Sequence, residues 1–377
     1  MAKIPLFNIY WDKSDIESVS KVIESGMNWA DGPIIGDFEE KITSYMGIKY
    51  AIAFNNGTSA LHAILLAHDI HPEDEIIVPS FTFISTANAC LFVGAKPVFA
   101  EIEKRFMGLD PEDVKNKITK KTKAIIPVHF GGCPCCIKEL KEIAENNNLL
   151  LTEDNAESMG ATVDGKKVGT FGDSGILSFC QNKIISTGEG GAVITNSKDI
   201  ANKLKLIRSH GRLATGDYFS SSHSFDYVSL GYNFRIPTMN AALGISQITK
   251  IDKIIDLRRE NAHIYTEYLK KYSEIKTLSY PMGILPVYQM YSILINASQR
   301  DALRTHLSEQ GIASKIYFDP VHLSKFYREK YHYKRGDLPH TEDISDSILS
   351  LPMYPSLQKE DIIRICNSIG TFLEEST

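Results

Sequence analysis

Cysteine, long apolar runs and excess positive charge are all scarce in this chain, and each scarcity excludes a class of protein. Six cysteines among 377 residues are too few for a disulfide framework. No apolar run approaches the ~20 residues that a membrane-spanning helix needs, and Met1–Leu6 lacks the apolar core of a signal peptide. The net charge of −5 gives no reason to expect nucleic acid or an anionic membrane as a partner. We therefore expect a cytoplasmic protein that binds neither.

Three of the six cysteines lie together in Cys133-Pro134-Cys135-Cys136. A metal or redox site is one interpretation of such a cluster. However, a zinc site needs about four ligands, and no second Cys/His pair follows at zinc spacing. An ordinary reduced loop is the preferred interpretation, and no metal is expected.

Apolar runs alternate with helical patterns between about residues 50 and 200. Strands are predicted at 50–55, 76–79, 97–102, 124–128, 149–153, 175–179 and 192–195. Helices are predicted at 58–68, 85–93, 111–118 and 137–146. Strands rich in Val, Ile and Leu that alternate with helices indicate an α/β fold with a mostly parallel, helix-covered sheet of seven strands. Only a turn around Lys183 joins the last two runs, so this pair is predicted to be antiparallel.

A second, smaller α+β unit is expected in the C-terminal part of the chain. One helix is predicted over 239–257, strands at 287–295 and 314–318, and a helix at 300–310 that Gly311 ends. The chain is accordingly divided into a large domain of residues 1–255 and a small C-terminal domain of residues 256–377.

Lys183 and Asp154 carry the most specific chemical signal. Lys183 follows a short apolar run and precedes a Gly-rich stretch that ends at Gly191, and Asp154 ends a predicted buried strand. A lysine amine can form a Schiff base with a carbonyl cofactor, and an aspartate can keep a pyridine nitrogen protonated. Pyridoxal 5′-phosphate (PLP) needs both groups, so PLP is the predicted cofactor. Taken singly, a surface lysine and a capping aspartate remain alternatives.

A candidate phosphate site follows the first predicted strand. Residues Asn56 to Leu61 open a helix in which Gly57 lets the backbone approach a ligand closely. The first N–H groups of the helix, with the hydroxyls of Thr58 and Ser59, could hold a phosphate. A capped helix start without a ligand is the alternative.

Further side chains could complete the site. Phe83 lies just past a strand end and could stack on a flat ring, with core packing as the alternative. Ser178 and Ser186 bracket the lysine and could add hydrogen bonds to a phosphate. Asn233 and Arg235 lie in a loop before a helix and carry groups that suit phosphate or carboxylate, with a surface turn as the alternative.

These motifs, taken in order, resemble one family over most of the chain. The sequence is similar to the fold-type I, PLP-dependent sugar aminotransferases of the DegT/DnrJ/EryC/StrS type, which act on nucleotide-linked keto sugars. The motifs that carry the resemblance are Asn56-Gly57-Thr58-Ser59-Ala60-Leu61, Pro79-Ser80-Phe81-Thr82-Phe83, Gly94-Ala95-Lys96-Pro97-Val98-Phe99, Glu153-Asp154-Asn155-Ala156-Glu157, Gly169-Thr170-Phe171-Gly172-Asp173, Asn182-Lys183 with Thr187-Gly188-Glu189-Gly190-Gly191, Gly231-Tyr232-Asn233, and Leu351-Pro352-Met353-Tyr354-Pro355.

The resemblance implies roles for the candidate residues. Lys183 would form the Schiff base, Asp154 would pair with the pyridine nitrogen, and Phe83 would stack on the ring. Asn233 would reach the phosphate from the neighbouring subunit, so the site would exist only in a homodimer. The residues implied around the phosphate within one subunit are Thr58, Ser59, Ser178 and Ser186.

Glu157 occupies a position where many members of this family carry Gln or His near the ring hydroxyl of the cofactor. A glutamate there is similar to the enzymes that make perosamine-type 4-amino sugars. A carboxylate beside that oxygen would need to be protonated or to share a proton. Relatives that replace the lysine with histidine dehydrate sugars, so Lys183 argues against dehydration.

The resemblance therefore implies transfer of an amino group from L-glutamate to C4 of a nucleotide-linked keto-6-deoxyhexose, with GDP-4-keto-6-deoxymannose as the first candidate. Arg212, Arg235 and His322 are expected substrate contacts. Arg212 and His322 lie in the loops 212–227 and 317–326, with surface exposure as the alternative for each of these two. A 3-keto sugar aminotransferase and a regulatory protein on the same fold are the alternatives. A Rossmann dehydrogenase lacks support because no strand is followed by G-x-G-x-x-G.

Overall fold

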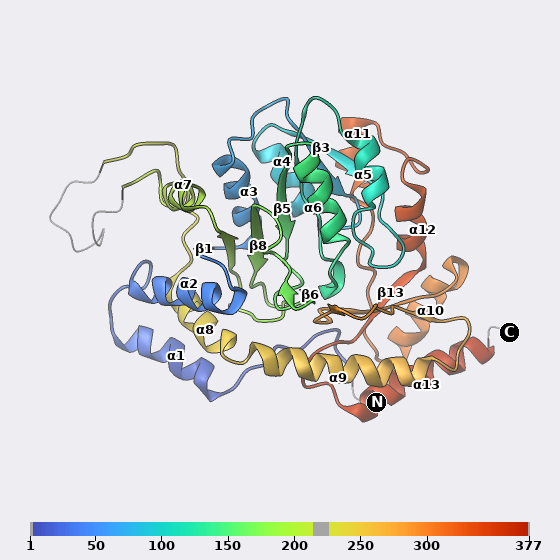
Figure 1. Cartoon of the computed structure of the whole chain (residues 1–377). Helices are drawn as coiled ribbons and strands as arrows, with labels where there is room; N and C mark the ends of the chain where they lie inside the picture. The colour runs from blue at the N-terminus through green and yellow to red at the C-terminus, as the bar shows by residue number, and fades with distance from the viewer. Residues whose placement is uncertain (1–2, 214–225, 376–377) are drawn as a thin grey trace.

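The computed structural model describes residues 3–213 and 226–375 (Figure 1). Within these residues the central sheet has seven strands in the order β1-β9-β8-β5-β4-β2-β3. The strands are β1 (Tyr50–Phe54), β2 (Glu75–Pro79), β3 (Lys96–Ala100), β4 (Thr122–Ile125), β5 (Leu150–Asp154), β8 (Ser174–Ser178) and β9 (Gly191–Thr195). The predicted α/β fold with a mostly parallel, seven-stranded sheet is confirmed.

Strand directions place six carboxyl ends at one edge of this sheet. The pairs β2/β3, β2/β4, β4/β5 and β5/β8 are parallel. Strand β9 is antiparallel to β8, as the short connection around Lys183 predicted, and it is also antiparallel to β1. Strand β1 therefore runs in the same direction as β8, and loops from these strands meet at one edge, where α/β proteins bind ligands.

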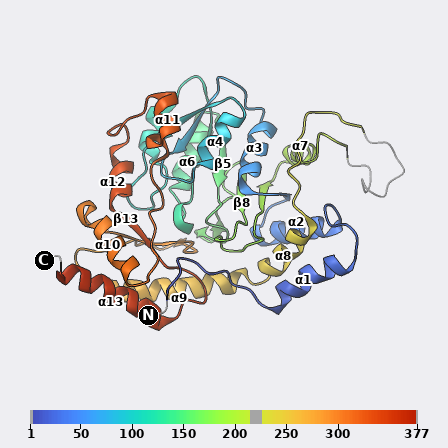
Figure 2. The same ribbon diagram turned by 180° about the vertical axis from the view of Figure 1, so that it is seen from behind.

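Both faces of the sheet are covered by helices, as Figures 1 and 2 show from opposite sides. Alternate residues of β2 enter opposite cores, because Ile77 packs in one apolar cluster while Ile76 and Val78 pack in the other. A sheet buried on both faces explains the nearly continuous apolar strands. The helices of this part are α1 (Lys13–Glu24), α2 (Pro33–Met46), α3 (Gly57–Ala67), α4 (Ser85–Phe92), α5 (Pro111–Lys117), α6 (Ile137–Asn146), α7 (Lys198–Arg208) and α8 (Thr238–Ile248).

The C-terminal part forms a separate apolar cluster around a small antiparallel sheet, β10-β12-β13. Its strands and helices are β10 (Lys276–Thr277), β12 (Tyr291–Leu294), β13 (Ile348–Leu351), α10 (Ala297–Glu309), α11 (Lys325–Tyr331), α12 (Pro339–Ser347) and α13 (Lys359–Glu375). A third sheet joins the two parts, since β11 (Ile284–Leu285) pairs with β6 (Thr162–Val163), which pairs with β7 (Lys166–Lys167). Within the described ranges, no helix is both long and apolar enough to cross a membrane.

The single helix predicted over 239–257 is wrong, because the chain forms two helices there. Helix α8 ends at Ile248, and α9 (Ile251–Leu269) begins after Lys250. The Lys250 ammonium lies 2.9 Å from a carboxylate oxygen of Asp12 and 2.7 Å from one of Asp15, which holds the break against the N-terminal segment. Helix α9 then continues into the C-terminal part, so the predicted division between residues 255 and 256 falls inside it.

Two predicted strands of the C-terminal part also differ from the structure. The run 287–295 contributes only the short strand β12, because the N–H groups of Val287 and Met290 donate to the carbonyls of Gly132 and Gly131. The run 314–318 forms a single bridge to β13 and no strand. In both runs, apolar residues lie in loops near the edge of the large sheet and not in strands.

Candidate active site

The predicted cofactor residues gather at the carboxyl edge of the large sheet. Gly57 follows β1, Phe83 follows β2, and Asp154 and Ser178 are the last residues of β5 and β8. Lys183 lies in the connection from β8 to β9. Parallel strands bring these residues together although they are spread over the sequence from residue 57 to residue 183.

The carboxylate of Asp154 is buried and held from two sides. Its side chain is 4% exposed, and burial raises its pKa above the ordinary value. Thr86 Oγ1 donates a hydrogen bond to Oδ2 at 2.8 Å, and the N–H of Ala156 donates to Oδ1 at 3.2 Å. Thr86 was not among the predicted site residues, since nothing in its local sequence marks a threonine of α4 as a partner of Asp154.

Asp154 is also supported by its neighbour Glu153, whose carboxylate is fully buried. Its two oxygens accept hydrogen bonds from the backbone N–H groups of Gly169, Phe171 and Gly172. The His129 ring nitrogen Nε2 lies 3.0 Å from Glu153 Oε2. This buried hydrogen-bonded network fixes the end of β5, from which the Asp154 side chain projects.

Lys183 and Glu157 form an ion pair inside the site. Lys183 Nζ lies 3.3 Å from Glu157 Oε1, and the two side chains are 13% and 5% exposed. The backbone N–H of Gly131 donates to Glu157 Oε2 at 2.9 Å. Lys183 is therefore a partly buried, oriented amine, and the surface alternative for this lysine does not describe its position.

The start of α3 lies against the ends of β8 and β9. The Asn56 side chain accepts a hydrogen bond from the N–H of Ser59 at 2.7 Å, which caps the helix. A Cβ on Gly57 would come within 3.1 Å of the Ser178 Cβ, and one on Gly191 within 2.6 Å of the Asn56 backbone. The two glycines therefore allow the helix N-terminus, which attracts anions, to approach the strand ends.

Ser178 and Ser186 flank the lysine loop in different environments. Ser186 is 4% exposed, and its Oγ accepts a hydrogen bond from the N–H of Gly188 at 3.0 Å. Ser178 is half-buried and faces Gly57. Ser178, at the end of β8, and Ser186, in the connection to β9, lie on either side of Lys183 in the chain.

Phe83 is exposed at the strand edge and is not a core residue. Its side chain is 58% exposed, which excludes the core-packing alternative. The nearest described aromatic contact is with Phe318, whose ring centroid lies 6.4 Å away. Phe318 comes from the C-terminal part and was predicted as a strand residue at the start of the expected substrate loop 317–326, with no role beside Phe83.

Asn233, Arg235 and Arg212 form a second group around Ser209. Asn233 is exposed and bridges to Ser209 through the backbone. Arg235 Nη1 donates to the Ser209 hydroxyl at 3.2 Å, and Arg212 Nη2 lies 3.9 Å from an Asp31 carboxylate oxygen. Residues 214–225 of the expected substrate loop 212–227 lie outside the described residues.

The substrate contact predicted for His322 does not fit the structure. His322 is fully buried, and its ring nitrogens Nδ1 and Nε2 lie 2.7 Å from Ser80 Oγ and 3.1 Å from Glu342 Oε1. Burial lowers its pKa, which favours the neutral ring. Both ring nitrogens are committed to internal partners, so His322 serves the fold at this edge and has no group left for a sugar.

The cysteine cluster is a reduced loop in the structure. All six cysteines are free thiols, and Cys133 and Cys135 are buried. Burial raises the pKa of the Cys135 thiol well above its ordinary value. Among the described residues, no group of three or more His, Cys, Asp or Glu side chains is arranged to hold a metal ion.

The arrangement fits a phosphorylated pyridine aldehyde. A partly buried amine, a buried carboxylate, an exposed aromatic ring and a helix N-terminus close to Ser178 converge on one strand edge. These features define a site for PLP.

Comparison with known proteins identifies the family. The chain belongs to the DegT/DnrJ/EryC1/StrS aminotransferase family, whose model matches residues 10–370. The GDP-perosamine synthase of Escherichia coli O157:H7 is 36% identical over 376 residues, covering 100% of both chains. A UDP-N-acetyl-3-dehydro-alpha-D-glucosamine 3-aminotransferase of Acidithiobacillus ferrooxidans is 36% identical over 333 residues, 88% of this chain and 86% of that one.

A solved structure agrees with this assignment. PseC of Helicobacter pylori, an aminotransferase involved in the biosynthesis of pseudoaminic acid, has a TM-score of 0.94 at 28% identity and covers 99% of this chain and 100% of its own. The protein is a nucleotide-sugar aminotransferase that uses PLP, as the sequence resemblance implied.

Proposed function

We propose that this enzyme transfers an amino group from L-glutamate to C4 of a nucleotide-linked 4-keto-6-deoxyhexose, and that GDP-4-keto-6-deoxymannose is the first substrate to test. The observation that carries the proposal is the end-to-end similarity to a GDP-perosamine synthase at 36% identity. The Lys183–Glu157 pair supports it, because glutamate at this position is similar to 4-aminating relatives.

Amination at C3 is the second candidate. The Acidithiobacillus ferrooxidans relative, named as a 3-aminotransferase, reaches the same 36% identity over most of both chains. Its substrate carries UDP and an N-acetyl group, so the two candidates differ in nucleotide, sugar and acceptor carbon. A product assay can therefore separate them.

The proposed roles of the site residues follow from their positions. Lys183 holds the cofactor covalently and moves a proton during each half-reaction, with Glu157 orienting its amine. Asp154 keeps the pyridine nitrogen protonated, and Phe83 stacks on the ring. Bound PLP supplies the electron sink for the amino transfer. The residues proposed to hold the phosphate are Gly57, Thr58, Ser59, Ser178 and Ser186.

A homodimer with shared sites is part of the proposal. Asn233 is exposed, which suits a side chain that completes the site of a second copy. Apolar residues are exposed along α1 and the segments beside it, including Trp11, Ile16, Met27 and Trp29, which are 63%, 55%, 64% and 48% exposed. A group of exposed apolar side chains marks a surface that a partner covers.

The substrate contacts are proposed for the arginines alone. Arg212 and Arg235 offer guanidinium groups that suit a nucleotide diphosphate, whereas His322 is withdrawn from this role. The cytoplasmic location stays a prediction and belongs to the same proposal.

The decisive experiment is a product assay with GDP-, dTDP- and UDP-linked 4-keto and 3-keto sugars, using glutamate as the donor. We expect transfer to the GDP-linked 4-keto sugar, with NMR of the product placing nitrogen on C4. Nitrogen on C3 would overturn the acceptor position, and turnover of UDP- or dTDP-sugars alone would overturn the nucleotide. Neither result would affect the aminotransferase assignment.

A further inference from the structure

His322 lies at a junction between the C-terminal part and the large sheet. It belongs to the short 3-10 turn η2 (Val321–Leu323), and its backbone N–H donates to Ser80 Oγ at 3.0 Å. The N–H of Val321 donates to the Ser80 carbonyl at 2.9 Å. The turn is therefore fastened to the residue that directly follows β2.

The hydrogen bonds of the His322 ring fix its tautomer. Glu342 can only accept, so Nε2 carries the proton, and Nδ1 accepts from the Ser80 hydroxyl. Ser80 Oγ thus donates to the ring and accepts from the His322 backbone. All three residues are at most 4% exposed, so an unpaired group here would be costly.

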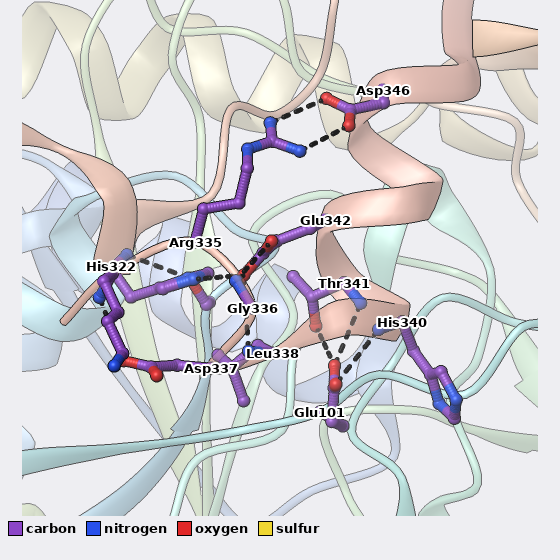
Figure 3. Close-up of polar contacts among 12 residues, drawn as sticks. Glu101, His322, Arg335, Gly336, Asp337, Leu338, His340, Thr341, Glu342 and Asp346 are labelled. Carbon is purple, nitrogen blue, oxygen red and sulfur yellow. Dashed lines mark hydrogen bonds and ion pairs between the residues drawn. The ribbon is translucent and has the colours of Figure 1, made fainter.

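Helix α12 carries Glu342 and holds it beside His322, as Figure 3 shows. The Glu342 carboxylate also accepts from the N–H of Gly336 at 2.9 Å and of Leu338 at 3.3 Å. Glu101, which follows β3, accepts from the N–H of Thr341 at 2.9 Å and from its hydroxyl at 2.6 Å. Because Glu101 joins α12 to the large sheet, Glu342 is held in place behind His322.

The segment that reaches Phe83 is bonded to α12 as well. The Ser345 hydroxyl of α12 donates to the Phe318 carbonyl at 2.9 Å. The Phe318 ring lies 6.4 Å from those of Phe83 and Phe81 and 6.2 Å from that of Phe130. Phe318 is four positions before His322, so the turn and α12 hold this segment from two sides.

We propose that His322, held between Ser80 and Glu342, is a positioning residue that sets Phe318 against Phe83 and thereby fixes the aromatic wall of the PLP site. The inference rests on the proposed ring-stacking role of Phe83 and is independent of the sugar and of the acceptor carbon. His322 acts through the segments 80–83 and 317–322, which it fastens together.

The first test measures the segment in the protein without cofactor. His322→Gln keeps an N–H donor near Glu342 but loses the acceptor for the Ser80 hydroxyl. His322→Asn keeps an acceptor near Ser80 but is too short to donate to Glu342. We expect hydrogen exchange of peptides covering residues 314–324 to become at least about tenfold faster in both variants, while peptides from β5 and β8 stay unchanged. Unchanged exchange in 314–324 would overturn the proposal.

The second test measures PLP itself. We expect the dissociation constant of PLP to rise about two- to tenfold in His322→Gln, the range expected when one aromatic stacking contact is misplaced. The glutamate half-reaction, followed by the absorbance of the cofactor, should lose kcat with little change in KM. Faster exchange together with unchanged PLP affinity and unchanged kcat would assign His322 a merely structural role.

Two further variants keep the test decisive. His340→Gln is the matched control, because this histidine is exposed on α12, the helix that carries Glu342; it should change neither exchange nor affinity. If His322 acts through Phe83, then Phe83→Leu and His322→Gln should be non-additive in PLP affinity. Additive losses would contradict that route. If the His322 variants do not fold, Ser80→Ala tests the same bond, with the same outcomes.

Discussion

Thr86 donates its hydroxyl to the carboxylate of Asp154 across 2.8 Å, from the first turn of α4 to the end of β5. The same Thr86 Oγ1 lies 2.9 Å from the Thr82 hydroxyl. Burial raises the pKa of Asp154, and the Thr86 hydrogen bond opposes this by favouring the ionised carboxylate. The threonine thus helps to keep the negative charge that a protonated pyridine nitrogen requires.

Replacing Thr86 with valine should remove this hydrogen bond to the ionised Asp154 carboxylate without changing the shape of the side chain at position 86. We expect Thr86→Val to lose about 1–3 kcal/mol of stabilisation at the Asp154 carboxylate, seen as a roughly 5- to 160-fold fall in kcat/KM. Thr86→Ser, which keeps the hydroxyl, is the matched control and should stay close to the parent enzyme. Equal losses in both variants would point to packing and not to the hydrogen bond.

Asp154→Asn should separate stability from activity. Folding raises the pKa of the Asp154 carboxyl above its ordinary value of 3.8. The ionised group therefore destabilises the cofactor-free protein at any pH above the folded pKa. This destabilisation disappears once the pH falls below 3.8, where the group is protonated in both the folded and the unfolded chain. The variant without cofactor should therefore unfold at a higher temperature than the parent at pH 7, with the difference shrinking towards pH 4. Its rate should fall by several orders of magnitude. A rate loss below about tenfold would contradict the assigned role of Asp154.

Lys183→Arg should keep the ion pair with Glu157 while removing the nucleophilic amine. Arginine stays protonated and cannot take the covalent role of lysine. We expect no measurable turnover and no lysine-linked absorption band of the cofactor, with an unchanged far-UV circular dichroism spectrum. Near-normal transamination by this variant would rule out the role proposed for Lys183.

Mixed dimers should test whether Asn233 serves a neighbouring site. Asn233→Asp sets a negative charge towards the phosphate and should be inactive alone, as should Lys183→Ala. After subunit exchange, a hybrid dimer would carry one intact site, so about a quarter of the parent activity should return at equal mixing, because half of the dimers are hybrids with one site each. Absence of recovery, once exchange has been shown by mass spectrometry, would count against a shared site.

The sequence predicted the large sheet well because its strands are short apolar runs separated by strong helix and turn signals. The residues at strand ends, such as Gly57, Asp154 and Ser178, follow directly from that pattern, since parallel strands share a carboxyl edge. Thr86 could not be found in this way, because its contact with Asp154 spans 68 positions and depends on how α4 packs.

The C-terminal part was harder to predict for a similar reason. Its apolar runs contact residues far away in the sequence. The N–H groups of Val287 and Met290, for example, donate to the carbonyls of Gly132 and Gly131. The break before α9 is set by Lys250 and two N-terminal aspartates, while the apolar spacing continues across it. His322 looked like a substrate contact because its burial cannot be read from its neighbours.

We expect helix α9 to make the two parts of the chain unfold together. Its first turns, with Ile251 and Ile255, pack in the core beneath the large sheet, and its last turns, with Tyr265 and Leu269, pack in the C-terminal core. Loss of either core would expose half of one continuous helix, and the remaining half would then pack less stably in the other core. Calorimetry should therefore record one cooperative transition for both parts, and neither half would be a self-sufficient folding unit if the chain were cut within this helix.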